Sequence, residues 1–390
     1  MDIEKHIQDM TDPSVLSMLL GGEIRFYAGF DPTSPSLQLG NLYVIKMMQR
    51  LMSLGNEPVV LLGGATGLIG DPSGKTRERT LQNYDVVLSN VTKMKSQIER
   101  LIPGVLVVNN LDWFQDFSVL DFLRDIGKHF RINEMLVRES VASRMKSTGM
   151  SLTEFVYQTM QAYDFLMLHD SLGVTLQMGG SDQFGNICSG VSLVRKVRNR
   201  KVFGLTIPLI TDKSGKKFGK SERGTIFCDP ELTTPYDMFQ FLVNVPDDQS
   251  IYLLDCLTDV EPDQIEELLS KPREERHFQK RLAEDVVRFI HGEEVLRNVV
   301  SSSNALFGGD TSETKSMIFE VGDVSLEDAL VSTSLFSSKS DVRRVADQGG
   351  LRINGIVTRD VKAMAISFST RFEVMRGKRS RCVVRVSGAQ

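Results

Sequence analysis

The chain has 390 residues, of which 41% are hydrophobic and 25% are charged, an ordinary balance for a globular protein with two or three domains. The four cysteines, Cys188, Cys228, Cys256 and Cys382, form no C-x-x-C pair. This spacing excludes a disulfide scaffold and leaves no recognisable metal site. No apolar run approaches the roughly 18 residues of a membrane span, and the N-terminus has no apolar signal core. We therefore expect a cytoplasmic protein with no membrane partner.

The net charge of −4 hides an uneven distribution along the chain. Residues 324–390 contain 12 Lys and Arg against 6 Asp and Glu, whereas residues 1–323 contain 34 against 44. Such asymmetry favours a basic C-terminal module that binds phosphates. A local excess on an ordinary solvated surface is the simpler alternative.

Short apolar runs alternate with helical patterns over roughly the first 220 residues. The runs at 24–30, 58–62, 105–108, 175–178 and 205–210 predict buried strands, and residues 42–54 predict a helix with a wide apolar face. Strands separated by helices of this length indicate βαβ units. The prediction is an α/β fold with a Rossmann-like parallel sheet.

The pattern changes after residue 229. Helices are predicted at 236–243, 250–254, 264–269 and 278–290, and the polar stretch 301–316 predicts a linker. Beyond it, helical patterns at 325–330 and 339–348 and β-like runs at 372–375 and 382–386 predict a small α+β unit. We therefore expect three domains, at 1–228, 229–318 and 324–390.

Two predicted strands end in segments rich in turn residues. In YAGFDPTSPSLQLGN (27–41), Gly40 stands where the helix begins, which would let a phosphate approach the helix N-terminus; a plain turn is nearly as good an interpretation. In GGATGLIGDPSGKTRER (63–79), only three residues separate Gly70 from Gly74, where a Walker A loop requires four. Asp71 there suits a cationic amine and the following bases suit phosphate, although a solvated charged turn is the alternative.

The segment TEFVYQTMQAYDFLML (153–168) predicts a helix with an aligned polar stripe. Tyr157, Gln161 and Asp164 fall at i, i+4 and i+7, on one face. A solvated stripe is the usual fate of such positions, but residues 155–168 contain no Lys, Arg or Glu, which indicates a buried helix. Buried polar groups need partners, and a polar ligand would provide them.

Two further segments suit a nucleotide. QMGGSDQFGN (177–186) places Asp182 and Gln183 after a strand, where they could bind ribose hydroxyls or a substrate carbonyl. DKSGKKFGKSER (212–223) is a Lys-rich loop that could close cations onto a transferring phosphate. A polar turn and a mobile solvated loop are the respective alternatives.

Five segments in this order, GFDPTSPSL, GGATGLIGDPSGK, YQTMQAYDF, GGSDQFGN and KFGKS, resemble the bacterial and organellar type of tyrosyl-tRNA synthetase, a class I aminoacyl-tRNA synthetase. The resemblance runs from about residue 23 to the C-terminus. It implies that Tyr27 and Asp164 bind the substrate phenol. It further implies that the ammonium group is held by Asp71, Tyr157 and Gln161, and the ribose and carboxyl end by Asp182 and Gln183.

The resemblance also implies an ATP site. KFGKS resembles the KMSKS signature, which would make Lys217 and Lys220 catalytic, while residues 36–41 stand where the HIGH signature is expected, with Gln38 and Asn41 at its histidine positions. ATP would further contact Thr33, Gly40, Asp182, Lys220 and Ser221. The implied enzyme is a tyrosine–tRNA ligase that uses ATP with Mg²⁺ and no tightly bound cofactor. Its partners would be L-tyrosine, tRNA(Tyr) and a second copy of the chain.

The C-terminal part resembles a small RNA-binding module first described in a ribosomal small-subunit protein, through SSKSDVRRVADQGGLRINGIV (337–357). By that resemblance Lys339, Arg343 and Arg344 would face RNA phosphates. The helical segment 229–318 stands at the family's anticodon-binding position, and residues 80–150 correspond to its connective insertion.

The sequence departs from the family at the HIGH signature, because Gln38 and Asn41 replace two histidines. Their amides can donate hydrogen bonds but cannot become cationic. A loss of about 1–2 kcal/mol would slow adenylation roughly five- to thirtyfold. A paralog kept for RNA binding is therefore an alternative to a working ligase, and a tryptophan-specific relative is a lesser one, since Tyr27 and Asp164 suit a phenol.

Overall fold

A computed structural model describes residues 3–73, 81–147, 149–211, 215, 218–221, 224–270, 276–307, 318–321, 325–333, 335–336, 338–361, 371–377 and 380–386. The chain divides into two compact units, Met1–Ile290 and His291–Gln390. Among the described residues, no helix is both long enough and apolar enough to cross a membrane.

A six-stranded sheet forms the centre of the first unit. Its order is β1-β6-β5-β2-β3-β4, with β1 antiparallel to β6 and all other pairs parallel. This confirms the predicted α/β fold. β6 ends three residues before the predicted position, next to Pro208, which has no N–H for the ladder. The strands are β1 (Asp9–Met10), β2 (Arg25–Phe30), β3 (Glu57–Leu62), β4 (Leu106–Asn109), β5 (Leu176–Gly180) and β6 (Phe203–Ile207).

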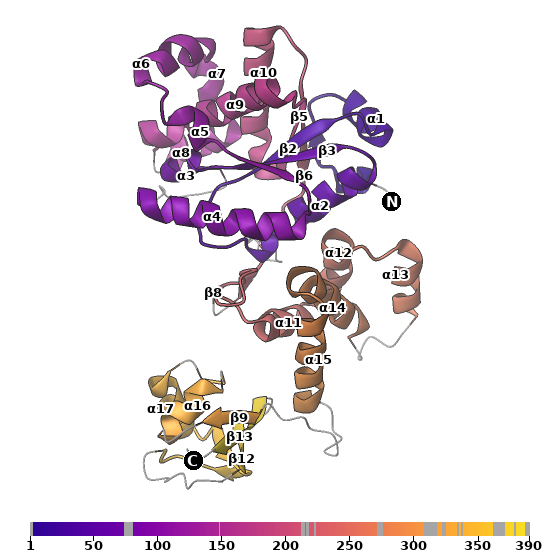
Figure 1. Cartoon of the computed structure of the whole chain (residues 1–390), viewed down its shortest axis with the longest axis vertical. Helices are drawn as coiled ribbons and strands as arrows, with labels where there is room; N and C mark the ends of the chain where they lie inside the picture. Colours follow the sequence, from indigo (N-terminus) through magenta and orange to yellow (C-terminus); the bar gives the residue numbers. More distant parts are fainter. Residues whose placement is uncertain are drawn as a thin grey trace. The chain divides into compact units, whose positions relative to one another are not determined.

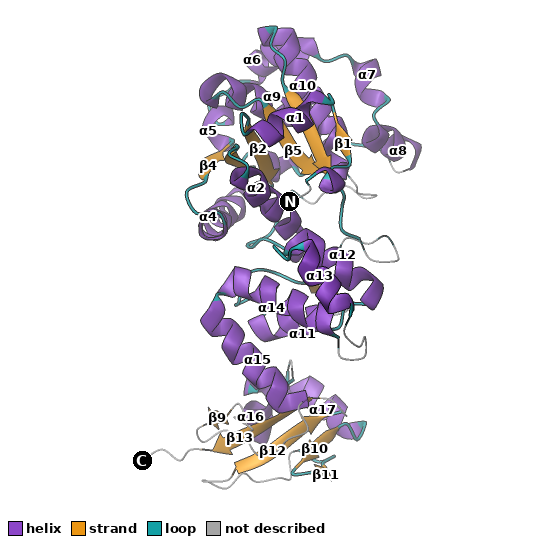
Figure 2. Cartoon of the chain, turned by 90° about the vertical axis from the view of Figure 1, so that its right-hand side faces the viewer, coloured by secondary structure: helices purple, strands orange, loops and turns teal. Residues whose placement is uncertain are grey.

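Helices cover both faces of this sheet (Figures 1 and 2), with α2 and α4 on one side and α9 and α10 on the other. The buried helix predicted at 153–168 is α9. Ser151 caps its start by accepting a hydrogen bond from the Glu154 N–H, and Gly173 ends it with φ of 67°. The helices are α1 (Ser14–Gly21), α2 (Leu42–Ser53), α3 (Thr66–Ile69), α4 (Tyr84–Leu101), α5 (Leu111–Phe114), α6 (Val119–Asp121), α7 (Ile132–Leu136), α8 (Glu139–Ser147), α9 (Leu152–Leu172) and α10 (Phe184–Arg198).

The four predicted helices after residue 229 are α11 (Pro235–Val243), α12 (Asp247–Leu257), α13 (Pro262–Leu269) and α14 (His277–His291). Polar contacts from α2 hold them in the first unit. The buried Arg50 guanidinium donates to the Thr258 carbonyl at 2.8 Å, and the buried Lys46 ammonium contacts the Asp259 carboxylate at 2.6 Å. Because both cations are buried and need partners, these contacts connect the helical segment to the helix that begins at the predicted nucleotide site.

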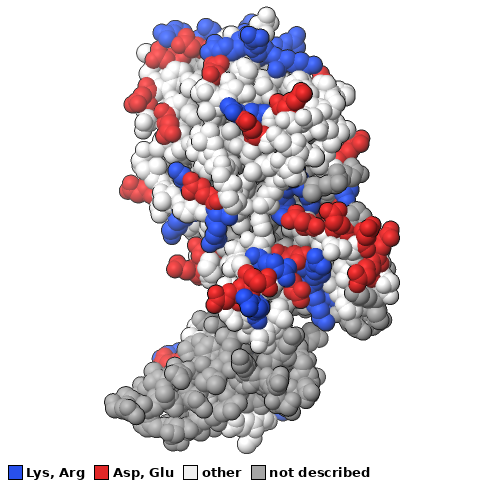
Figure 3. Space-filling view, turned by 45° about the vertical axis from the view of Figure 1, so that its right-hand side comes forward, with Lys and Arg blue, Asp and Glu red and all other residues white. Residues whose placement is uncertain are grey.

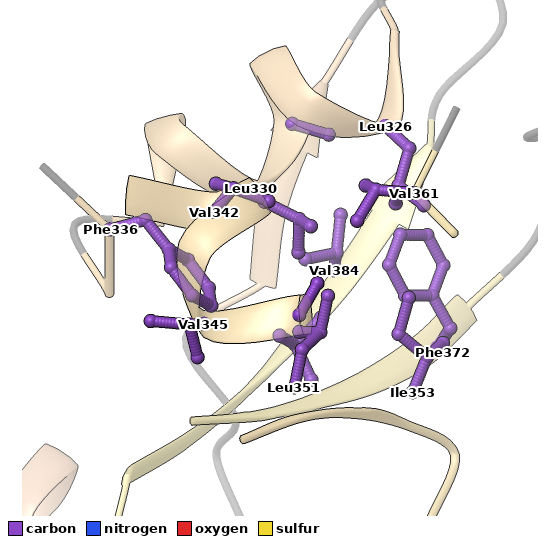
Figure 4. Close-up of a cluster of buried hydrophobic side chains, with 13 residues drawn as sticks. Leu326, Leu330, Phe336, Val342, Val345, Leu351, Ile353, Val361, Phe372 and Val384 are labelled. Carbon is purple, nitrogen blue, oxygen red and sulfur yellow. The ribbon is translucent and has the colours of Figure 1, made fainter. Parts of the chain in front are cut away.

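The second unit contains a five-stranded sheet of order β11-β10-β12-β13-β9. Leu330, Val342, Leu351 and Val384 lie at the centre of its hydrophobic core between sheet and helices (Figure 4). Helices and strands occur together in this unit. Its elements are α15 (Glu293–Phe307), β9 (Ile318–Val321), α16 (Leu326–Ser332), α17 (Lys339–Asp347), β10 (Leu351–Ile353), β11 (Ile356–Val357), β12 (Arg371–Arg376) and β13 (Ser380–Val386).

The linker predicted at 301–316 is wrong for residues 301–307, which belong to α15. Val295, Leu296 and Val299 begin an apolar stripe at helical spacing, and the serines that follow are compatible with a helix already begun. Residues 308–316 lie outside the described part of the chain.

Candidate active site

A cavity of about 410 Å³ opens at the carboxyl ends of β2, β3 and β5. The strand order reverses between β2 and β5, the switch point where open parallel sheets bind ligands. The cavity wall contains eleven residues singled out from the sequence: Tyr27, Thr33, Gln38, Gly40, Asn41, Asp71, Tyr157, Gln161, Asp164, Asp182 and Gln183. Segments up to 156 positions apart in the chain therefore meet at one site.

The innermost polar groups of the wall are Tyr27 on β2 and Asp164 on α9. Tyr27 is buried, packs edge-to-face on Phe165 with ring centroids 5.3 Å apart, and its hydroxyl has no hydrogen-bond partner among the described residues. Burial and the nearby charge of Asp164 raise the pKa of Tyr27 well above its usual value, so the hydroxyl stays protonated. A buried hydroxyl without a partner costs free energy until a ligand supplies one.

Two donors hold the Asp164 carboxylate in place. The Trp113 indole N–H donates to one oxygen at 2.9 Å, and the Asn110 amide donates to the other at 3.1 Å. Burial raises the pKa of Asp164 to about 7, although these two hydrogen bonds oppose the rise. Near neutral pH the site therefore contains a carboxyl group close to its midpoint, oriented by two fixed donors.

A second polar group lies toward the cavity mouth. The Gln183 amide donates to the Asp71 carboxylate at 2.6 Å, and the Gln161 amide donates to Gln183 Oε1 at 3.2 Å. The Asn186 amide donates to Gln161 Oε1 at 3.0 Å and to Ser73 Oγ at 3.2 Å. These amides orient one another, and the arrangement offers carboxylate and amide oxygens to a cationic group.

A chain of hydrogen bonds runs from Asp164 to Tyr157 along the cavity wall. The Tyr157 hydroxyl donates to Asp31 Oδ2 at 2.7 Å, and the Thr66 hydroxyl donates to Asp31 Oδ1 at 2.8 Å. The Asn110 amide contacts Thr66 Oγ1 at 2.9 Å as well as Asp164. Asp164 and Tyr157, both residues singled out from the sequence, are therefore coupled through Asp31, Thr66 and Asn110.

Sequence reasoning missed several residues of the site: Asp31, Thr66, Asn110, Trp113, Gln177 and Asn186. Asp31 directly follows β2, and Asn110 follows β4, so polar residues at strand ends were an available signal. Trp113 carried no such signal, because a single tryptophan near a strand is typical of a hydrophobic core. Gln177, a buried cavity residue on β5 paired in register with Tyr27, was hidden inside a predicted strand.

The predicted nucleotide side of the cavity is built around the start of α2. A short 3₁₀ turn, Leu39–Asn41, precedes this helix, and Asn41 Oδ1 accepts a hydrogen bond from the Gln38 N–H at 2.8 Å. The amide nitrogen of Asn41 is thereby left as the donor that can turn toward a ligand. Backbone N–H groups and the dipole at this helix start favour a phosphate.

The Lys-rich loop is anchored beside this turn. The Leu39 N–H donates to the Ile226 carbonyl at 3.0 Å, and the Ile226 N–H donates to the Gly219 carbonyl at 2.8 Å. A Cβ added to Gly40 would lie 3.4 Å from the Phe218 carbonyl oxygen, so the two segments touch. The backbone of Lys220 and Ser221 forms strand β7 (Lys220–Ser221), paired with β8 (Gly224–Thr225), whereas Lys217 lies outside the described residues.

Comparisons with known proteins agree with this geometry. The family model of the class I tRNA synthetases for tryptophan and tyrosine matches residues 20–308. A tyrosine–tRNA ligase of Bacillus caldotenax is 42% identical, over 97% of each chain, and one of Bacillus subtilis is 43% identical, over 90% of this chain and 88% of the relative. The chain belongs to the tyrosyl-tRNA synthetase family. It is a class I aminoacyl-tRNA synthetase.

A solved relative supports the fold of this synthetase. A C-terminally truncated mitochondrial tyrosyl-tRNA synthetase of Aspergillus nidulans is 30% identical and superposes with a TM-score of 0.69, covering 78% of this chain and 93% of that one. The likeness agrees with the mostly parallel sheet and its helices in the first unit.

The basic residues predicted to bind RNA lie on one helix of the synthetase, α17, and each has an acidic partner. Lys339 contacts Asp328 at 2.6 Å, Arg343 contacts Glu327 at 2.8 Å, and Arg344 contacts Asp341 at 2.6 Å. All three basic side chains are about half exposed, whereas the carboxylates of Glu327 and Asp341 are nearly buried, and Glu327 accepts from two nitrogens of Arg343. On the face in Figure 3, Lys and Arg gather at the upper end of the first unit but elsewhere alternate with Asp and Glu.

Trp113, the only tryptophan of the chain, makes the Asp164 carboxyl observable. We expect intrinsic fluorescence to titrate with a midpoint near pH 7, because protonation of Asp164 changes the group that accepts from the indole N–H. Asp164→Asn should abolish the transition, while Asp116→Asn, which leaves the hydrogen bond intact, should retain it. A flat wild-type profile between about pH 5 and 9, or an unchanged one in Asp164→Asn, would contradict this assignment.

Proposed function

We propose that this synthetase activates L-tyrosine with ATP to form tyrosyl adenylate and then transfers the tyrosyl group to the 3′ end of tRNA(Tyr). The observation that carries the substrate assignment is the partnerless Tyr27 hydroxyl beside Asp164 at the inner end of the cavity. A phenol O–H can accept from one and donate to the other. An indole has a single donor and would leave one of them unpaired.

The second polar group suits the other end of tyrosine. Asp71 and Gln161 offer oxygens to the ammonium group, and Tyr157 borders the same space through Asp31. Gln183 and Asp182, which follow β5, stand where the carboxylate and the ribose would meet. When the substrate tyrosine is bound in this orientation, its carboxylate faces the start of α2 and the phosphates of ATP.

The positions of the two substrates then determine the first step, the formation of tyrosyl adenylate. A carboxylate oxygen of tyrosine attacks the α-phosphorus of ATP, the bond to the bridging oxygen breaks, and pyrophosphate leaves with its electron pair. Thr33, Gln38, Gly40 and Asn41 line the phosphate side of the cavity. From the KFGKS loop, we assign Lys217, Lys220 and Ser221 as the donors that stabilise the negative charge on the departing pyrophosphate. Mg²⁺ prefers substrate phosphates to an all-protein cage, so we expect it to arrive with ATP.

In the second step a ribose hydroxyl of the tRNA attacks the carbonyl carbon of tyrosyl adenylate, and AMP leaves. We assign recognition of the tRNA to the helical segment 229–318 and to the C-terminal domain 324–390, in addition to the catalytic domain 1–228. The half-exposed side chains of Lys339, Arg343 and Arg344 would contact RNA phosphates. A cytoplasmic location accords with this role in protein synthesis.

We also propose a homodimer formed through the insertion at 80–150. Large apolar side chains of its short helices are exposed to solvent, including Val119 (73%), Leu120 (78%), Ile132 (65%) and Val137 (77%). A cluster of this kind is typical of an interaction surface. We assign a second copy of the chain as the partner that covers this patch, because two copies related by a two-fold axis bring the same apolar patch together.

The purified protein should exchange labelled pyrophosphate into ATP in a tyrosine-dependent manner. Gln38→His should not slow this exchange and should speed it by up to roughly thirtyfold, because a cationic donor would replace a neutral amide. No exchange above background, with RNA binding preserved, would favour a paralog retained for RNA binding. A collapse of activity in Gln38→His would show that the amide has a role of its own.

Sedimentation equilibrium tests the dimer. The wild-type chain should sediment at twice the mass of one chain, and Leu120→Asp should sediment as a monomer because it places a carboxylate in the apolar contact. Leu269→Asp changes an equally large, half-exposed leucine on α13 and should leave the dimer intact. A monomeric wild type at micromolar concentration would rule the interface out.

A further inference from the structure

The buried face of α4 contains amide side chains among its apolar residues. This helix is the long one beside α2 in Figure 1. Val87, Val91, Met94 and Ile98 form an apolar stripe, and Asn90 and Gln97 occupy the same face two turns apart, both at most 8% exposed. Buried amides destabilise a helix packing face unless they find partners.

Both amides find their partners in residues 32–37, the loop that follows β2. The Asn90 amide donates to the Pro32 carbonyl at 3.0 Å. Gln97 Oε1 accepts from the Leu37 N–H at 2.9 Å and from the Ser36 hydroxyl at 3.2 Å. The helix therefore holds this loop at both ends.

A third amide contacts the middle of the same loop. Gln82, two residues before α4 begins, donates from its amide to the Thr33 carbonyl at 3.0 Å. Three side-chain amides thus bind main-chain or hydroxyl groups of one six-residue segment. Asn83 caps the helix next to Gln82 by accepting from the Asp85 N–H, which fixes where the helix starts.

The loop needs such external partners because of its own sequence. Pro32 and Pro35 lack N–H groups, so the segment cannot form a regular ladder or helix. Pro32, Ser36 and Leu37 are nevertheless buried, and their polar groups require hydrogen bonds. Met94, from the same face of α4, lines the cavity together with Thr33 and Gln38.

We propose that Gln82, Asn90 and Gln97 of the insertion are positioning residues for the adenylation step. By fixing residues 32–37, they place Thr33 and the adjoining Gln38 against the phosphates that leave as pyrophosphate. The inference rests on the proposed function, since it assumes that these two residues face ATP. It assigns to α4 a role in aligning the nucleotide, and none in binding tyrosine.

Steady-state kinetics of Gln97→Met and Asn90→Leu test the proposal. Both changes keep the side-chain size and remove the hydrogen-bonding groups. We expect kcat/KM for ATP to fall about 10- to 100-fold, as misplaced phosphate contacts do. Tyrosine affinity, read from Trp113 fluorescence, should stay within about twofold, since Asp164 and its donors lie on other elements.

Gln49→Met is the matched control. Its amide donates to the Leu101 carbonyl at 2.9 Å, joining α2 to the far end of α4, so the variant breaks the same kind of bond away from the loop. It should keep all kinetic constants within about twofold. If a core variant does not fold, Gln82→Ala at the more accessible position should still lower kcat/KM for ATP about two- to tenfold.

Three outcomes separate the possibilities. Unchanged ATP kinetics in folded Gln97→Met and Asn90→Leu, with an active wild type, would overturn the positioning role alone. A parallel loss of tyrosine affinity would overturn it too, because the helix would then stabilise the whole domain. A wild type without exchange activity would refute the proposed function instead.

Discussion

The site depends on one constraint: a carboxyl group and a phenol hydroxyl share the dry inner end of a cavity, where each needs a hydrogen-bond partner. Asp164 has two partners from the protein, Asn110 and Trp113, and Tyr27 has none among the described residues. A substrate hydroxyl placed between them satisfies both groups at once. A ring without a hydroxyl would leave the buried Tyr27 hydroxyl unpaired in a low-dielectric site, which is the more costly state.

The scaffold places this pair through elements that the sheet topology brings together. β2 supplies Tyr27 and α9 supplies Asp164, while β4 leads through Asn110 into α5, which carries Trp113. The hydrogen-bonded chain through Asp31 and Thr66 then couples Asn110, and with it Asp164, to Tyr157. The start of α2 and the β7–β8 segment meet through main-chain hydrogen bonds, so the proposed tyrosine and nucleotide sites share one scaffold.

Most of the fold followed from periodicity, since each predicted strand of the parallel sheet is a continuous apolar run. The site residues that belonged to recognisable motifs, such as Tyr157 and Asp182, also line the cavity as expected. Residues that only position other site residues through hydrogen bonds were not predicted. Trp113 and Asn90 look like core or helix surface in sequence, because their hydrogen-bond partners lie more than 50 residues away. The seven-residue error at 301–307 arose because serines were taken as linker inside a helix.

The most direct test of the central claim is the ratio of kcat/KM for tyrosine to that for phenylalanine in ATP–pyrophosphate exchange. Enzymes of this type discriminate by about 10⁵ when buried polar groups would otherwise go unpaired, and we expect a ratio of that order. Asp164→Asn and Tyr27→Phe should each reduce it. A wild-type ratio near or below about 10², the limit for a purely apolar pocket, would contradict the account.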